Sequence, residues 1–454
     1  MNTPGSTAIP ESPAEEAWLY YLAAAAVLSS LVIAVLGMPD LLTSGPRRFS
    51  LLLLSLPFIL GAGVIALKHR LRDIKPGAID TALLVAMTYL MIRNIRLVSI
   101  EYAVYGISLF YLSSLVVQQQ RFLKAIIFTF VSLAAIASLL GAAELFLLQD
   151  NLASLFISNP DSGTVFHRIG STLLHPVVFG AFLAMALPLC GFLGIFGTTR
   201  KARILGLSST ALGLLAFLFT FSKGGWLVMI LMGCVFGLFF IKNRNWPRLL
   251  LVAGLVIIVI LLPVLLLWQP VTHQTMIRLK SSFVSRRLTW ECSIRAAEQN
   301  LIFGTGLRMG PSALPALDEN IRKFNETHPN LMPVDNFYLS YSLEEGLAGF
   351  FPFLLFLILL LMRGAKSLFE RGANRALLIA IFASIVGILL DALTFEMFSW
   401  WSIYVCFWSM AGMLYGLTMP GYNRPVFHCK PGVRNRGLAQ APAGSDRLCV
   451  DQNL

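Results

Sequence analysis

The sequence predicts an all-α integral membrane protein, and three observations support this fold class. The chain of 454 residues is 57% apolar and only 13% charged, whereas soluble proteins carry about 25% charged residues. Its mean hydropathy is +0.74. Apolar stretches of roughly 20 residues, the length that one transmembrane helix needs, recur along nearly the whole chain. We therefore predict about 12 transmembrane helices rather than several soluble domains.

The spans are assigned from the apolar stretches in chain order, and the third is the shortest. The first follows three glutamates rather than a basic stretch and is too long for the core of a signal peptide, so we expect it to be retained. The predicted spans are 18–37, 50–67, 78–92, 98–117, 124–148, 173–196, 204–221, 225–241, 247–268, 335–362, 375–395 and 398–417.

Lysine and arginine are distributed unevenly between the two sides of these helices. With the N-terminus inside, 21 of the 35 basic residues lie in inner loops or the C-terminal tail, and six lie in short outer loops. Because basic loops remain in the cytoplasm, both termini are predicted to be cytoplasmic. The net charge of +12 is then an orientation signal, and no nucleic-acid partner is expected.

Two outer segments are longer than the other connections. The larger of the two, residues 269–334, is expected to be functional, because a compact bundle rarely carries so long a loop without a role. Within it, 286–300 is predicted to form an amphipathic helix with Leu288, Cys292 and Ile294 among its apolar positions, followed by a glycine-rich turn. Cys292 is the one cysteine of six on the outer side, so no disulfide is expected.

The predicted organisation of the whole chain follows from these spans and loops. It is a cytoplasmic tail over 1–17, helices one to nine over 18–268 with a periplasmic loop at 149–172, the large periplasmic loop 269–334, helices ten to twelve over 335–417 and a cytoplasmic tail over 418–454.

Several kinds of chemistry are disfavoured by missing motifs. The sequence contains no G-x-x-x-x-G-K-[ST] loop for a nucleotide phosphate and no G-x-G-x-x-G after a strand. It lacks the D-x-D with which nucleotide-sugar transferases commonly hold a metal, and its cysteines and histidines are not spaced as zinc ligands. We therefore expect no metal and no cofactor, with single ionisable side chains carrying any chemistry.

Four places on the predicted outer face carry such side chains. Arg168 precedes the sixth span, Lys223 lies at a hairpin tip before two glycines, Arg287 lies on the loop helix, and Asp335 with Asn336 opens the tenth span. Arginine and lysine in such positions can bind an anion. Each place also has a structural interpretation: an interfacial arginine, a snorkelling lysine, a solvated basic face and a helix N-cap.

Ionisable residues inside predicted spans are costly and therefore informative. Asp391 and Glu396 lie near the outer end of the eleventh span, and Glu144 lies near the outer end of the fifth. They either face one outer cavity or pair with nearby arginines. Gly346 and Gly349 follow Asp335 in the tenth span and predict close helix packing there.

Together, these places resemble the O-antigen ligase and polymerase family of bacterial membrane glycosyltransferases, which has about twelve helices and a large periplasmic loop between helices nine and ten. The topology matches over the whole chain, and four motifs occur in the family's order. They are R-x-x-G (Arg168, Gly170), a T-x-S-R-G-like stretch (Thr220, Ser222, Lys223, Gly224), a P-x-x-G-x-G-like turn (Ile302 to Gly306) and an H-N-x9-G-x-x-G-like stretch (Asp335, Asn336, Gly346, Gly349).

The sequence departs from the family pattern at three places. Lys223 stands where arginine is usual, and Leu301 and Ile302 replace the proline before the turn. Asp335 stands where ligases carry histidine, and the nearest histidine is His328. Because lipopolysaccharide ligases depend on that histidine whereas polymerases vary more at this position, the resemblance favours a polymerase.

The resemblance implies a metal-independent glycosyltransferase in exopolysaccharide or lipopolysaccharide biosynthesis. The donor is a glycan on undecaprenyl diphosphate, the acceptor is another glycan, and the active face is the periplasmic side of the bacterial inner membrane. Membrane lipid, a flippase and a chain-length regulator are the other implied partners. The implied roles are diphosphate binding and catalysis for Arg168, diphosphate binding for Lys223 and Arg287, general base for Asp335 or else His328, and support for Asn336, Gly346, Gly349 and Asp391.

Three alternatives remain open at this point. One is an O-antigen ligase that acts on a lipid or protein acceptor. Another is a secondary transporter, although the paired, interrupted helices typical of that class are not evident. The third is a non-catalytic assembly partner.

Overall fold

The computed structural model of the chain describes about half of its length, and its secondary structure there is entirely helical. The all-α class is therefore confirmed for this part of the chain. The described residues are 13–36, 77–93, 97–146, 169–220, 222, 224–226, 228–229, 232, 286–287, 289–306, 334–369 and 374–419.

Nine of the predicted spans coincide with α-helices among the described residues. The short third span is one of them. The spans predicted at 50–67, 225–241 and 247–268 lie wholly or mostly outside the described residues, so the number twelve stays a prediction. The helices are α1 (Pro13–Leu36), α4 (Ala78–Arg93), α5 (Leu97–Val116), α6 (Gln120–Phe146), α7 (Pro176–Phe196), α8 (Arg200–Phe219), α14 (Phe337–Phe369), α15 (Arg375–Asp391) and α16 (Trp401–Leu417), with 3-10 helices η2 (Ser171–Leu173) and η3 (Met397–Ser399).

Four helices in the described part of the chain are long and apolar enough to cross a membrane. They are the helical stretches Gln120–Glu144, Pro176–Phe196, Arg200–Phe219 and Phe337–Phe369. The stretches Tyr20–Leu36, Tyr102–Val116 and Trp401–Leu417 are apolar but shorter. Helices satisfy every backbone polar group internally, which is the condition for crossing lipid.

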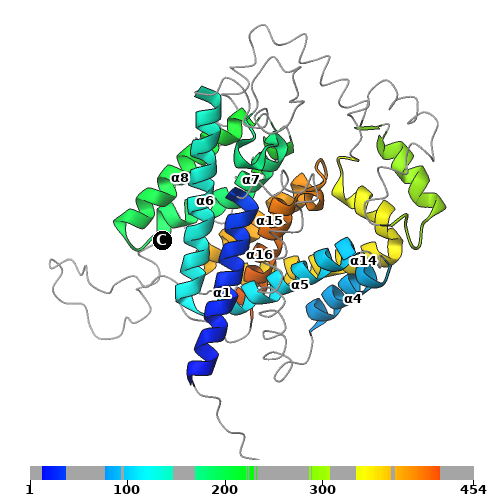
Figure 1. The fold of residues 1–454 in the computed structure, drawn as a ribbon, viewed down its shortest axis with the longest axis horizontal. Coiled ribbons are helices and arrows are strands. Elements are labelled where there is room, and N and C mark those ends of the chain that lie inside the picture. The colour runs from blue at the N-terminus through cyan, green and yellow to red at the C-terminus, as the bar shows by residue number, and fades with distance from the viewer. Residues whose placement is uncertain are drawn as a thin grey trace, which may run out of the picture.

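The centre of the bundle is formed by α7, α15 and α16 (Figure 1). Every residue of α16 is buried. Helix α7 packs against α8 on one side and α15 on the other, α5 packs against α16, and α4 packs against α14. The α7–α8 contact is close because Gly194 and Gly206 face each other, and a Cβ on Gly206 would collide with the Gly194 amide.

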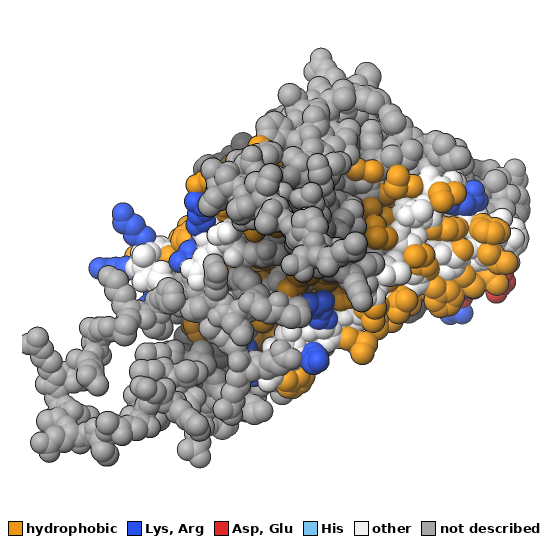
Figure 2. All heavy atoms as spheres, turned by 90° about the horizontal axis from the view of Figure 1, so that it is seen from below, with side chains coloured by type: hydrophobic (Ala, Val, Ile, Leu, Met, Phe, Trp, Pro, Cys, Tyr) orange, Lys and Arg blue, Asp and Glu red, His pale blue; other side chains and the backbone are white. Residues whose placement is uncertain are grey.

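The outer surface of α4 and α14 is strongly apolar. Figure 2 shows hydrophobic side chains gathered on this side of the molecule, with few charged groups among them. Exposed apolar side chains of this kind, in such number, mark a surface that contacts lipid or another protein. They include Leu84, Val85, Ile92, Phe351, Leu355, Ile358 and Met362.

Candidate active site

Several helix ends meet on one side of the bundle. The Ile169 amide donates to the Phe219 carbonyl at the end of α8 (3.2 Å), and the Phe337 amide at the start of α14 donates to the Ala392 carbonyl just after α15 (2.8 Å). The backbone of Gly224 lies against Asp391 and Thr394. The segments that carry the predicted motifs are therefore neighbours, although long stretches of sequence separate them.

The segment before α7 is held by the buried carboxylate of Glu144. This carboxylate accepts hydrogen bonds from the amides of Gly170 (3.2 Å) and Ser171 (2.8 Å). Ser171 and Leu174 both have positive φ, 52° and 60°, which is uncommon for non-glycine residues. Glu144 thus fixes the glycine of the R-x-x-G motif, and its role is structural. Arg168 itself lies outside the described residues.

The turn after α8 is closed by its own polar side chains. The buried Thr220 hydroxyl accepts from the Ser222 amide (3.3 Å), and the Ser222 carbonyl accepts from the Trp226 amide (2.9 Å). Gly224 follows, and a Cβ there would collide with the Thr394 hydroxyl. Glycine is therefore needed for close approach to the end of α15. Lys223, between these residues in sequence, lies outside the described part.

Asp335 lies just before α14 and faces an arginine of the loop helix. Its Oδ2 is 3.4 Å from Nε of Arg286, and about one third of each side chain is exposed. This distance is long for a hydrogen bond, so the pair is a loose ion pair. The carboxylate is thus oriented by a cation but is not locked by it.

The predicted structural role of Asp335 as a helix N-cap is wrong, because its neighbour caps the helix. The Asn336 side-chain oxygen accepts from the Leu339 amide at 3.1 Å, the usual N-cap geometry. Asp335 has a φ of 44°, and its carboxylate faces Arg286. Asn336 therefore supports the site, and the Asp335 carboxylate remains available for chemistry.

Two further carboxylates surround this ion pair. Asp391 is only 1% exposed, and its carboxylate makes no hydrogen bond of good geometry to any residue that the structure describes. Arg286 lies close enough to interact with its charge. Glu396, on the other side, interacts electrostatically with Asp335 and accepts a hydrogen bond from the Ser340 hydroxyl at 2.7 Å.

Burial and charge determine the basicity of Asp335. Burial raises the pKa of the Asp335 carboxyl above its ordinary value, the nearby Arg286 guanidinium lowers the pKa, and the negative charge of Glu396 raises it. The net effect is a raised pKa. A carboxylate of raised pKa is a stronger base than an ordinary aspartate.

The glycine-rich turn of the large loop docks against a break in α14. Gly346 has φ 62° and ψ −173° inside α14, so the helix is interrupted there. The Thr305 and Gly306 amides donate to the Leu343 and Glu344 carbonyls at 2.9 and 2.8 Å. These are the carbonyls that the interruption exposes, so the turn replaces the missing helical hydrogen bonds.

Neither glycine at this contact tolerates a side chain. Gly304 has φ 68°, and a Cβ there would collide with the Glu344 carbonyl oxygen; a Cβ on Gly346 would collide with the Ile302 carbonyl oxygen. The prediction that Gly346 serves helix packing is therefore wrong, because it forms a break instead. Gly349 does serve packing, since it lies against the Tyr89 ring of α4.

Helix α4 also holds this turn in place through hydrogen bonds. Arg93 donates to the carbonyls of Phe303 and Gly304, both at 3.2 Å. The Tyr89 hydroxyl donates to the Glu345 carbonyl at 2.9 Å. The end of α4, the glycine turn and the break in α14 therefore form one connected unit.

The loop helix is present where it was predicted, over 289–299 and at 286–287, but its buried face differs. Cys292 is buried, whereas Ile294 is 49% exposed. Arg287 points to solvent, 74% exposed, and pairs with Glu291 at 2.7 Å. Arg286, one position earlier, faces Asp335. The structure therefore brings Arg286 rather than Arg287 into the site. His328 lies outside the described residues.

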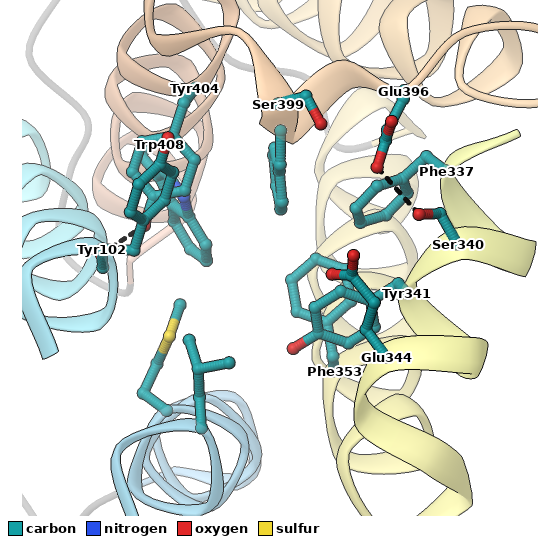
Figure 3. A pocket seen from close by; sticks show the side chains of 13 residues that line it. Tyr102, Phe337, Ser340, Tyr341, Glu344, Phe353, Glu396, Ser399, Tyr404 and Trp408 are labelled. Atoms are coloured by element: carbon teal, nitrogen blue, oxygen red, sulfur yellow. Dashed lines mark hydrogen bonds between the residues drawn. The ribbon is translucent and has the colours of Figure 1, made fainter. Parts of the chain in front are cut away.

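A pocket opens beside Glu396, between α4, α5, α14, η3 and α16. It is partly open, and its empty space, which includes solvent at the mouth, is about 630 Å³. Figure 3 shows the oxygens of Glu344 and Glu396 directed into it, with aromatic rings on the walls. Its lining residues are Met87, Leu90, Tyr102, Phe337, Ser340, Tyr341, Glu344, Phe353, Glu396, Phe398, Ser399, Tyr404 and Trp408.

A metal site is not indicated by this geometry. Among the residues that the structure describes, no group of three or more histidine, cysteine or acidic side chains is arranged to hold a metal ion. The acidic residues of the site instead have an arginine or a hydroxyl as their neighbour.

The comparison with known families decides the class of this site. Residues 208–354 match the family model described as O-antigen ligase. Residues 208–354 are therefore similar to the O-antigen ligase family. The matched segment contains Asp335, Arg286 and both glycines of the docked turn, so the resemblance drawn from the motifs is confirmed. No curated protein sequence matches the chain.

The sequence-based prediction did not assign a role to three residues that the structure brings to this site or its supporting turn. Glu344 lies in the middle of an apolar span, a signal that should have marked it beside Asp391 and Glu396. Arg286 is one of several arginines of the loop helix, and the sequence-based prediction selected its neighbour Arg287 for the site. Arg93 gave no local signal, because its partners are more than 200 residues away in sequence.

Proposed function

We propose that this O-antigen ligase-family protein is a membrane glycosyltransferase that extends surface polysaccharide on the periplasmic face of the bacterial inner membrane. It transfers a glycan from undecaprenyl diphosphate to a second glycan, and a polymerase is favoured over a ligase. The family match supports glycosyl transfer in general. The observation that carries the residue assignment is the Asp335 carboxylate, oriented by Arg286 at 3.4 Å at the meeting point of the family motifs.

Asp335 acts as the general base in this proposal. Its carboxylate takes the proton from an acceptor hydroxyl, and the hydroxyl oxygen forms a bond to the anomeric carbon of the donor. The bond from that carbon to the diphosphate oxygen breaks, and the electron pair remains on the carrier diphosphate. One displacement of this kind inverts the anomeric centre. The raised pKa of Asp335 favours the proton transfer.

Basic side chains balance the charge of the leaving diphosphate. We assign this role to Arg168 and Lys223, with Arg286 taking the assisting place first given to Arg287. Arginine grips diphosphate oxygens with two parallel hydrogen bonds. Because donors directed at developing negative charge are often the largest catalytic contribution, no metal ion is needed in this mechanism.

The deciding experiment uses a strain that lacks this gene. It is complemented with wild type, with Asp335→Asn or with Glu298→Gln, a matched control that removes an exposed carboxylate from the loop helix. Surface polysaccharide and carrier-linked intermediates are separated on gels. We expect single repeat units to accumulate on the carrier in the Asp335→Asn strain, with protein level unchanged, and long chains to return with wild type and with Glu298→Gln.

The same gels distinguish the second candidate, a ligase, which the description of the family model favours. A ligase defect leaves long chains attached to the carrier, whereas a polymerase defect leaves single units. Unchanged glycans in the deletion strain would contradict both glycosyltransferase proposals and favour a transporter or an assembly partner.

A further inference from the structure

The aromatic pocket beside Glu396 differs in chemistry from the rest of the site. Its walls are rings from α5, α14, η3 and α16, including Tyr341 and Phe353 of α14 and Trp408 of α16. Two carboxylates, Glu344 and Glu396, and the Ser340 and Ser399 hydroxyls provide its polar groups. In Figure 3 the carboxylates lie near one wall and the Tyr404 and Trp408 rings form the wall opposite. A ligand between them meets rings on its faces and oxygens at its edge.

We infer that this pocket binds the terminal sugar of the acceptor glycan. A pyranose ring has C–H faces of slight positive charge, which pack on the negative faces of aromatic rings. Its hydroxyl groups lie around the edge, where carboxylates accept hydrogen bonds from them more strongly than neutral oxygens do. The inference rests on the proposed function, because an acceptor sugar is needed only if the protein transfers glycans.

The charge of the pocket favours a neutral sugar over the donor diphosphate as its ligand. No lysine, arginine or histidine occurs among the lining residues that the structure describes, so a diphosphate would meet two carboxylates and no cation. Like charges in a partly desolvated site repel strongly. The donor diphosphate therefore binds outside this pocket, and a neutral sugar fits the pocket.

The polar groups also argue against a prenyl chain as occupant. A hydrocarbon would cover the charged oxygens of Glu344 and Glu396 with apolar atoms, which is unfavourable. Glu396 connects the pocket to catalysis, because it lines the pocket and also interacts with Asp335. A sugar in the pocket thus places an edge hydroxyl towards the base.

Binding of glycan can be measured without catalysis. The full-length protein in lipid nanodiscs is titrated with a carrier-free oligosaccharide of one repeat unit, released by mild acid from the strain's own carrier lipid. Tryptophan fluorescence reports occupancy, because Trp408 lines the pocket. We expect saturable binding that Glu344→Gln weakens roughly tenfold or more, the loss of one charge-assisted hydrogen bond, and that Glu298→Gln leaves unchanged.

A second variant fills the pocket instead of removing a charge. Ser399 is exposed at the pocket wall, so Ser399→Trp is compatible with folding, which thermal melting verifies. We expect this variant to lose oligosaccharide binding while binding of geranyl diphosphate, a short donor analogue, persists. Oligosaccharide that fails to bind wild type, binds both variants normally, or is displaced by farnesol or inorganic diphosphate would overturn the assignment.

The Asp335→Asn protein, compared with wild type in binding and in polymerisation, separates this inference from the proposed function. If it binds oligosaccharide like wild type, the pocket assignment stands independently of the base. If Asp335→Asn retains full polymerase activity while Glu344→Gln still loses binding, the base assignment fails and the pocket assignment survives.

Discussion

At the scale of single residues, the site depends on which charges surround Asp335. The loop-helix arginine that matters is Arg286, although the sequence-based prediction selected Arg287. The helix phase explains the difference: the buried residues Cys292 and Ala296 define the inner face, and Arg286 lies on that face whereas Ile294 does not. A loop helix buries only a narrow stripe, so two arginines one position apart point to different sides.

The charges around Asp335 predict two opposite shifts of the pH profile. A base works only when deprotonated, so the rate falls as pH drops through its pKa. Arg286 lowers the pKa of Asp335 and Glu396 raises it. Arg286→Gln therefore moves the acid side of the rate profile to higher pH, and Glu396→Gln moves it to lower pH. Polymerisation by membrane vesicles, followed as a function of pH, measures both shifts.

The opposite signs make this test specific. Loss of stability alone lowers the rate at all pH values and does not move the two profiles in opposite directions. The exposed variant Glu298→Gln is the control and keeps the wild-type profile. Equal shifts, or none, would show that Asp335 does not titrate in catalysis.

At the scale of elements, α14 shows what local sequence can and cannot reveal. Its apolar content and its start beside Asp335 follow from composition and from the Asn336 cap. Its break at Gly346 does not, because the break is stabilised by a turn about forty residues earlier in the chain, through the Thr305 and Gly306 amides. The glycine spacing within the tenth span predicts close packing of an uninterrupted helix. Only the order of the family motifs indicated that these glycines and the glycine-rich turn of the large loop are part of one site.

The break at Gly346 predicts that one added methyl group strongly lowers stability and activity. Gly346→Ala must place a Cβ at φ 62° against the Ile302 carbonyl oxygen. The backbone conformation at φ 62° and ψ −173° is essentially restricted to glycine and costs about 1–3 kcal/mol for another residue, and the collision adds about 1–3 kcal/mol. We expect a clearly lower melting temperature and loss of polymer formation. Gly191→Ala in α7 is the matched control, since a Cβ there meets nothing within 4 Å.

The two measurements also distinguish stability from site geometry. Polymer formation that disappears while the melting temperature is kept would show that the break positions Asp335 without stabilising the fold. A Gly346→Ala protein with the stability and activity of wild type would contradict the docking of the turn on α14.

At the scale of the whole molecule, contacts from distant segments assemble the site. Nine predicted spans coincide with helices among the described residues, because hydropathy alone reports which segments suit lipid. Only tertiary contacts show which helix ends meet, because hydropathy predicts the side of the membrane that a helix end faces but not its neighbours. The sequence therefore could not predict the proximity of the segments that carry Glu144, Gly224, Asp391 and Asp335. The distribution of lysine and arginine predicts how the bundle is oriented in the membrane, and this predicted orientation can be tested directly.

Two engineered cysteines test which face carries the site. Glu298→Cys lies on the exposed side of the loop helix, and Lys201→Cys lies exposed at the start of α8. The buried thiols Cys190, Cys292 and Cys406 remain, because buried thiols react slowly, and the three other native cysteines become alanine. In intact spheroplasts a membrane-impermeant maleimide is expected to label Glu298→Cys at once and Lys201→Cys only after the membrane is opened.

This result decides whether the proposed chemistry has access to its donor. Lys201 belongs to the basic loop that orients the bundle, whereas Glu298 shares the loop helix with Arg286 and therefore reports the side of Asp335. Labelling of Lys201→Cys alone in intact spheroplasts would place Asp335 on the cytoplasmic side. A base on that side could not meet a glycan already exported to the periplasm, so reversed labelling would overturn the polymerase proposal even if every contact around Asp335 were correct.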